Sequence, residues 1–224
     1  MIFNRTVEFL ASLPNDIFWL FLSGFIFLVM ALVFLIGPYR QEKDELMDAF
    51  IGFLGGMSLF HLFGGLSMLL GNPFLMYIGS FGALTGSAFI VKFPLLSVSN
   101  RKLRQTSFYV ALALGWLLIV WMFISNSDIM TSMRLASIYM IVFSGLSGAY
   151  IIWKGFQFPK LGTRIKCVGG GSSIWFCCFL THSIVLTVGM IGLAKIFMVL
   201  TPVTLVLAVL IGRSLSHQDT PLAV

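Results

Sequence analysis

The chain has 224 residues, of which 58% are hydrophobic and 10% are charged, and its mean hydropathy is +1.00. A water-soluble domain carries about 25% charged residues, so this composition excludes an ordinary soluble protein. The formal net charge is +6, with 14 Lys and Arg against 8 Asp and Glu. In so apolar a chain, the basic excess predicts contact with anionic lipids of the cytoplasmic leaflet and no binding of nucleic acid.

The apolar residues form long blocks and not short alternating segments. A helix needs about 20 apolar residues to cross a hydrocarbon core of roughly 30 Å, whereas a barrel strand alternates over about 10 residues. We therefore predict an all-α polytopic membrane protein, a single domain over residues 1–224 with seven transmembrane helices in one bundle. The predicted spans cover residues 17–37, 48–71, 73–94, 106–124, 132–153, 172–191 and 195–213.

Turn residues separate these blocks along the chain. Gly37-Pro38 closes the first span, and Gly71-Asn72-Pro73 forms the tightest boundary, between the second span and the third. Asn72 can cap the third helix, while Pro73 can occupy its first turn without loss of a backbone donor. The second and third spans are therefore expected to form a close hairpin.

Two histidines lie deep in predicted spans. His61 in the second span and His182 in the sixth differ in depth by only about 5 Å, at 1.5 Å per helical residue. Ser58 and Gly65 share the His61 face by helical spacing, and Cys178 shares the His182 face. Small residues beside a histidine allow close helix approach or leave space for a ligand.

The histidine pair is compatible with four roles. The two imidazoles could ligate haem b from opposite sides, or with Cys178 they could hold a metal such as zinc or copper. Neutral imidazoles could also respond to protonation or to a polar ligand in a sensory bundle. In the fourth role each histidine makes only an interhelical hydrogen bond, worth about 0.6 kcal/mol on average in a membrane bundle.

The third and fifth spans carry faces of small residues. In the third span these are Gly79, Gly82 and Gly86 with Ser80, Thr85 and Ser87, and in the fifth they are Ser137, Ser144, Gly145, Ser147 and Gly148. Such faces are chiefly packing surfaces between helices. With Tyr77, Tyr139 and Ser144, they could also line a polar ligand pocket in the outer half of the bundle.

A glycine-rich turn, KCVGGGSS at residues 166–173, leads into the sixth span. Backbone amides at a helix start next to basic side chains can contact an anion such as a lipid phosphate. The residues expected to do so are Arg164, Lys166, Gly169, Gly170 and Gly171. The turn lacks the Lys-Ser/Thr ending of a phosphate-binding loop, so a nucleotide is not predicted and a flexible hinge is favoured.

Lys and Arg are distributed unequally between alternate connections. Eleven lie in one set of connections and the C-terminal tail, while the other set holds only Arg5, Arg134 and Lys195. Short basic loops stay in the cytoplasm, so the bias places the N-terminus outside and the C-terminus inside. An odd number of spans agrees with this orientation.

All eight acidic residues lie outside the predicted spans or at their ends. Ion-coupled transporters usually carry an intramembrane carboxylate, so this pattern counts against that class, and no acid is placed to orient a catalytic histidine. We expect a non-enzymatic inner- or plasma-membrane protein of sensory or signalling type. No appended soluble domain is recognisable, so it is expected to act through a membrane or cytoplasmic protein partner. The alternatives are a redox protein that binds haem b or a metal through His61 and His182, and a permease or channel for a neutral or anionic solute.

Overall fold

A computed structural model describes residues 15–36, 45–92 and 101–147, together with five single helical positions between 193 and 203. The elements are α2 (Asn15–Ile36), α4 (Glu45–Leu70), α5 (Pro73–Ile90), α7 (Arg101–Ile124), α8 (Ile129–Met140) and a π-helix, η1 (Ile141–Gly145). This part of the chain is all-α. The predicted span 172–191, the end of the fifth span and most of the seventh lie outside the described residues.

Four of these helices are long and apolar enough to cross a membrane. Their apolar segments of 18 to 20 residues are Asp16–Val33, Ile51–Leu70, Pro73–Ile90 and Gln105–Ile124. At 1.5 Å per residue these segments are about 27 to 30 Å long, which matches a hydrocarbon core. The protein is therefore a multi-pass integral membrane protein, as the composition predicts.

All of these helices except α5, which begins at the predicted residue 73, begin two to five residues before the predicted spans. α4 begins at Glu45 and α7 at Arg101, three and five residues before the predicted starts at 48 and 106. Hydropathy detects only the part of a helix inside the hydrocarbon core, whereas the backbone hydrogen bonds continue through the polar first turn. At the other end, α5 stops at Ile90, four residues before Pro94.

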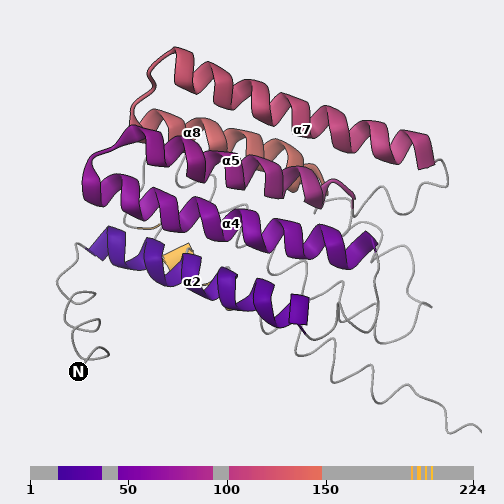
Figure 1. Ribbon diagram of the computed structural model, residues 1–224, viewed down its shortest axis with the longest axis horizontal. Coiled ribbons are helices and arrows are strands. Elements are labelled where there is room, and N and C mark those ends of the chain that lie inside the picture. Colours follow the sequence, from indigo (N-terminus) through magenta and orange to yellow (C-terminus); the bar gives the residue numbers. More distant parts are fainter. Residues whose placement is uncertain are drawn as a thin grey trace, which may run out of the picture.

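The helices α2, α4, α5 and α7 lie in a row in that order, and α8 lies beside α5 and α7 (Figure 1). Consecutive helices of the row are antiparallel. The start of α2, the α4–α5 turn and the α7–α8 turn therefore meet at one end of the bundle, called here the turn end. A hydrogen bond of 2.7 Å from the Tyr77 hydroxyl to the carbonyl oxygen of Ser127 joins the two turns.

The α4–α5 turn has the predicted cap. Gly71 has a φ of +63°, which a glycine adopts without strain, and the Asn72 side chain accepts a 3.0 Å hydrogen bond from the amide of Phe74. Ser67 adds a bond of 2.8 Å from its hydroxyl to the carbonyl oxygen of Asn72. The close hairpin expected from Gly71-Asn72-Pro73 is therefore confirmed.

Glycines bring the backbones of α4 and α5 into direct contact. A Cβ atom on Gly56 would lie 2.8 Å from Gly86 Cα and would also clash with the carbonyl oxygen of Gly82. A Cβ atom on Gly82 would lie 2.6 Å from Leu59 Cβ, and one on Gly86 would lie 3.1 Å from the carbonyl oxygen of Phe53. These glycines form a packing surface, the role expected for the small-residue face of the third span.

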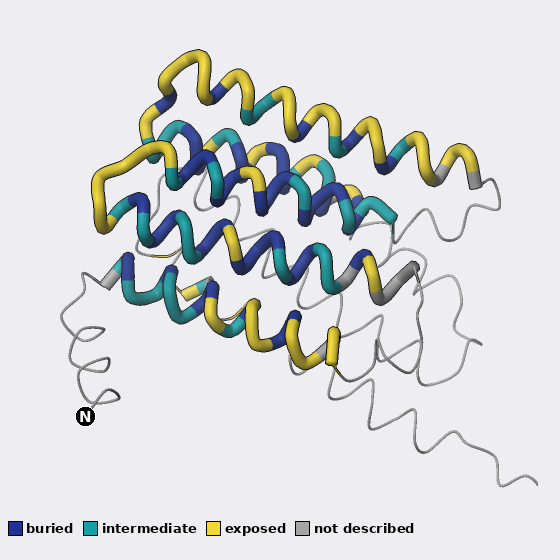
Figure 2. Tube along the Cα trace, in the orientation of Figure 1, coloured by how far each residue is buried: buried dark blue, intermediate teal, exposed yellow. Residues whose placement is uncertain are grey.

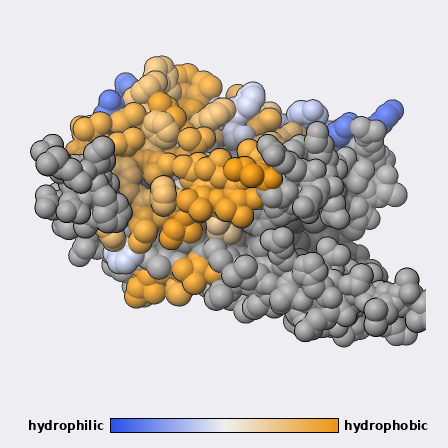
Figure 3. Space-filling view, turned by 60° about the horizontal axis from the view of Figure 1, so that its bottom comes forward, coloured by the Kyte–Doolittle hydropathy of each residue, from blue (hydrophilic) through white to orange (hydrophobic). Residues whose placement is uncertain are grey.

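Burial follows the order of the row. Along α4 and α5 most of the described residues are buried or half-buried, whereas α7 is exposed on most of its circumference (Figure 2). The exposed residues of the helices are largely apolar, and the surface over them is hydrophobic, with hydrophilic residues toward its ends (Figure 3). Such a surface is suited to lipid and not to water.

The α7–α8 turn contains its own helix cap. Asn126 has a positive φ of 47°, and Asp128 accepts hydrogen bonds of 2.8 Å from both the amide and the hydroxyl of Thr131. These bonds stabilise the carboxylate and lower the pKa of Asp128 below its ordinary value of 3.8. A negative charge also interacts favourably with the start of α8.

We predict opposite effects for two neighbouring glycine substitutions in α4. Gly56→Ala places a methyl group against the backbone of α5 and should lower the free energy of unfolding by about 1–3 kcal/mol. At Gly55 an added Cβ meets nothing within 4 Å, so Gly55→Ala should be neutral or raise stability by up to about 1 kcal/mol. Unfolding in detergent measures both, and equal effects would contradict the packing described above.

A second prediction concerns the Asp128 cap. Because its pKa is lowered in the folded protein, the stability contributed by the charged form is complete above pH 3.8 and is lost as the pH falls through the lowered pKa. Hydrogen exchange at the amide of Thr131, corrected for intrinsic rates, should therefore speed up only at acidic pH. Asp128→Asn should remove this pH dependence, and Asp128→Ala should speed exchange at every pH; an acid response that persists in Asp128→Asn would assign it to another group.

Candidate functional site

His61 is buried near the middle of α4, nine residues before the helix ends at Leu70. Its Nδ1 atom lies 2.8 Å from the carbonyl oxygen of Met57, one turn earlier in the same helix. A carbonyl oxygen can only accept, so in the neutral ring Nδ1 carries the proton and Nε2 is the acceptor nitrogen. In this tautomer Nε2 is the ring nitrogen that can accept a hydrogen bond or coordinate a metal.

Aromatic rings contact the imidazole on two sides. Phe27 of α2 is stacked on it with ring centroids 5.4 Å apart and an angle of 20° between planes. Phe60 meets it edge-on at 5.5 Å and 82°. The histidine therefore belongs to the α2–α4 interface, and its ring is positioned by packing as well as by its hydrogen bond.

The other two residues predicted on this face also contact α2. The Ser58 hydroxyl donates a 2.9 Å hydrogen bond to the carbonyl oxygen of Gly24, and a Cβ on Gly65 would lie 3.3 Å from Phe21. The structure thus brings Ser58, His61 and Gly65 together on one surface, packed against another helix. Small residues beside a histidine either allow close helix approach or leave space for a ligand. On the side of His61 that faces α2, they allow close helix approach.

Gly24 is a residue of this site that the sequence analysis missed. A Cβ at this position would lie 2.8 Å from Leu62 Cγ and 3.0 Å from the Leu62 amide nitrogen, so only glycine allows α2 to come this close. The sequence feature that could have identified Gly24 is the Ser23-Gly24 pair, two adjacent small residues in an otherwise bulky apolar helix. In a membrane helix such residues mark the interface.

Metal binding by this site depends on residues that the structure does not describe. Among the described residues there is no group of three or more His, Cys, Asp and Glu side chains that could hold a metal ion. The predicted partners of His61, namely His182 and Cys178, lie outside the described residues. The same holds for the predicted anion-contact residues Arg164, Lys166, Gly169, Gly170 and Gly171.

The two tyrosines predicted to line a polar pocket bind α7 and the turn that follows it. Tyr77 on α5 donates to Ser127 in that turn, and the Tyr139 hydroxyl on α8 donates a 2.6 Å hydrogen bond to the carbonyl oxygen of Ala111. The Tyr77 hydroxyl therefore bonds to the turn after α7, and the Tyr139 hydroxyl bonds to the interior of α7 itself. Ser144, predicted for the same pocket, is buried in the π-helix η1.

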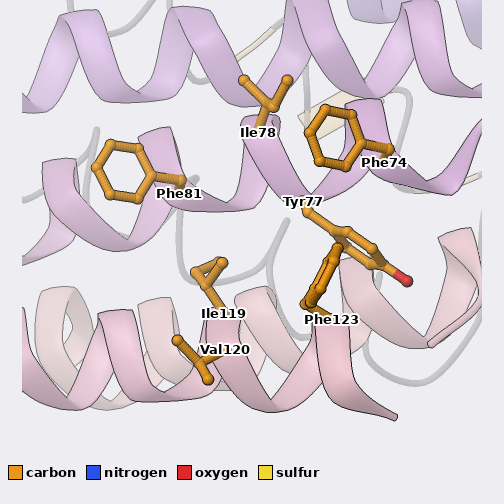
Figure 4. A pocket seen from close by; sticks show the side chains of 7 residues that line it. All are labelled: Phe74, Tyr77, Ile78, Phe81, Ile119, Val120 and Phe123. Atoms are coloured by element: carbon orange, nitrogen blue, oxygen red, sulfur yellow. The ribbon is translucent and has the colours of Figure 1, made fainter. Parts of the chain in front are cut away.

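An open groove of about 340 Å³ lies between α5 and α7. Figure 4 shows its apolar side chains converging from the two helices. The lining residues are Phe74, Tyr77, Ile78, Phe81, Ile119, Val120 and Phe123. The only polar atom of these side chains is the Tyr77 hydroxyl, which already donates to Ser127, so the groove offers a polar ligand little to bind.

We predict that the imidazole ring stabilises the α2–α4 interface chiefly through packing. His61→Ala removes a fully buried ring and should lower the free energy of unfolding by about 2–5 kcal/mol. His61→Phe keeps an aromatic ring against Phe27 and should retain most of the stability. Leu70→Ala, at a position 65% exposed at the end of the same helix, is the control and should have little effect. A His61→Phe variant as unstable as His61→Ala would contradict the packing role.

No family model matches the chain, and no curated protein or solved structure is similar to it. Among the described residues, the most specific polar arrangement is the histidine site in the α2–α4 interface, where His61 bonds to Met57 and Ser58 bonds to Gly24.

Proposed function

We propose that the protein is a non-enzymatic, seven-helix membrane protein of sensory or signalling type that acts through a partner protein. The observation that carries this proposal is the interior of the described helices, which is polar but carries no buried acidic or basic side chain other than His61. Among the residues whose burial is described, the buried polar side chains are His61, tyrosines and serines, and none is Asp, Glu, Lys or Arg. Coupled ion transport usually requires an intramembrane charge, so this interior favours recognition of a ligand over transport of ions.

The proposed topology has the N-terminus outside and the C-terminus in the cytoplasm of an inner- or plasma-membrane protein. The described helices support it through their basic residues, because Arg134 is the only Lys or Arg of these helices that lies toward the turn end. The opposite end carries Lys92, Arg101, Lys102 and Arg104, together with the acidic residues Glu45 and Asp48. In the proposed orientation this basic end contacts the anionic cytoplasmic leaflet.

A partner could bind the broad exposed face of α7. This face carries large apolar side chains along the whole helix, including Trp116, Leu117 and Trp121. Trp116 also stacks on Phe81 of α5 at 5.8 Å, so part of the surface is held in a fixed geometry. Aromatic side chains bury a large area in interfaces, so this face offers a contact area to another transmembrane helix as well as to lipid.

The geometry of His61 favours an alternative function, that of a redox protein that binds haem b or a metal. The bond from His61 to Met57 fixes the tautomer in which Nε2 is the acceptor, and backbone-bonded histidines of this kind are common metal and haem ligands. The second ligand would be His182. Haem b would supply one-electron transfer, while the rings of Phe27 and Phe60 would orient the imidazole.

The proposal predicts a colourless and metal-free protein. Purified protein should show no Soret band after reduction with dithionite and should contain no zinc or copper. A Soret band that is present in the native chain and lost in both His61→Phe and His182→Ala would establish haem binding instead. Liposomes holding the protein should swell no faster in glycerol or urea than empty vesicles; faster swelling would establish a permease.

The partner is tested in native membranes with a photo-crosslinking residue at Leu117, which is 64% exposed on α7. The matched control is Val33, which is 59% exposed on α2. Leu117 should give a discrete protein adduct that Val33 does not give. The activity of the protein so identified should change when His61→Phe is introduced; an unchanged activity would contradict signalling through this site.

A further inference from the structure

Four buried serine hydroxyls make no hydrogen bond in the part of the chain that the structure describes. They belong to Ser80 and Ser87 on α5, Ser132 on α8 and Ser144 in η1, and each residue is at most 1% exposed. A hydroxyl group removed from water without a hydrogen-bond partner is unfavourable. Such hydroxyls are candidates for hydrogen bonding to a molecule from outside the chain.

Two neighbouring serines show that a serine hydroxyl in a helix can donate to the backbone carbonyl oxygen one turn earlier. Ser137 donates to the carbonyl oxygen of Met133 at 2.8 Å, and Ser147 donates to that of Phe143 at 2.7 Å, each one turn earlier. Ser144 lies between these two residues on the same segment and does not make this bond. Ser144 differs from these neighbours in that it lies in the π-helix, a conformation frequently found at functional sites.

Ser87 and Ser144 lie at the same depth. α5 and α8 both begin at the turn end and run in parallel, and Ser87 and Ser144 come fourteen and fifteen residues after the starts of their segments. Both are therefore about 20 Å from that end. The elements are in contact, and Phe143 of η1 packs against the cluster of Ala88, Phe108 and Ala111, in which Ala88 follows Ser87.

A half-buried cation, Lys92 just after the end of α5, lies beside this cluster, with its ammonium 4.3 Å from the ring centroid of Phe108. No Asp, Glu, Lys or Arg is buried among the residues whose burial is described. Ser80 and Ala83 continue the small-residue face of α5 toward the turn end, by i, i+3 and i+7 spacing with Ser87. A neutral site of hydroxyl groups suits a ligand that both donates and accepts hydrogen bonds and carries no net charge.

We propose that Ser87 and Ser144 form a binding site between α5 and η1 for a small neutral hydrogen-bonding molecule. This chemistry is shared by water and by hydroxyl- or amide-bearing solutes such as glycerol and urea. The site is separate from His61 and does not depend on a signalling partner. At this site α5 and η1 would bind a ligand in addition to packing against each other.

Thiol accessibility tests the site in membrane vesicles. Ser87→Cys and Ser144→Cys are made in a chain whose Cys167, Cys177 and Cys178 are replaced by serine, and the probe is 2-aminoethyl methanethiosulfonate. The cysteine thiolate attacks the sulfur of this reagent, forms a mixed disulfide and releases methanesulfinate. The thiolate forms in a polar, hydrated site and not in a dry apolar contact. Both cysteines should react at least tenfold faster than Ala88→Cys, the matched control at an equally buried position one residue away.

Added solutes separate the two sources of the ligand. Glycerol or urea that slows the reaction of both cysteines, relative to the exposed control Ser125→Cys, identifies a solute site. Unchanged rates identify a water site. Rates as low as that of Ala88→Cys, in variants that melt at the native temperature, would overturn the proposal.

Alanine variants give a second measurement should the cysteine variants fail to fold. Removing a hydroxyl that binds a ligand leaves that ligand unpartnered, so Ser87→Ala and Ser144→Ala should lower the melting temperature. Ser137→Ala is the control, because its hydroxyl is bonded within its own helix. Melting temperatures of Ser87→Ala and Ser144→Ala equal to or above the native value would overturn the proposal.

Discussion

The close backbone contact of α4 and α5 at Gly56, Gly82 and Gly86 is the constraint on which the rest of the described bundle depends. Lipid chains are as apolar as leucine, so helices in a membrane associate through packing and hydrogen bonds. The absence of side chains at these positions brings the two helices together along a single line. It also fixes the rotation of α5, which leaves one of its other faces to α7 and another to α8 and the π-helix.

Much of this arrangement is predictable from the sequence, because its causes are local. The apolar blocks place the first four spans, and Gly71-Asn72-Pro73 predicts a turn that the Asn72 cap then confirms. The glycine face of the third span is visible from its spacing, and Gly52 and Gly56 on α4 form a small-xxx-small pair that could have identified the opposing surface. Each of these features depends on a few adjacent residues.

Other features are not predictable because they depend on contacts between distant segments. α4 is apolar on nearly all sides, so its sequence does not show that the His61 face meets α2 and the ring of Phe27. The π-helix is also not predictable from the sequence, because one extra residue per turn does not change the pattern of a uniformly apolar run. The predicted pairing of His61 with His182 depends on how the second and sixth spans are rotated relative to each other. The periodicity of the sequence cannot determine that rotation.

The two helix interfaces of α4 differ in a way that bears on function. Toward α5 the contact is between backbones and cannot change without separating the helices. Toward α2, Gly24 allows close approach, but Ser58, His61 and Phe27 contribute side-chain contacts that can rearrange. A ligand or proton at His61 would therefore act first on the position of α2, while α4, α5, α7 and α8 moved little. A sensory role for the histidine thus requires α2 to be the moving element.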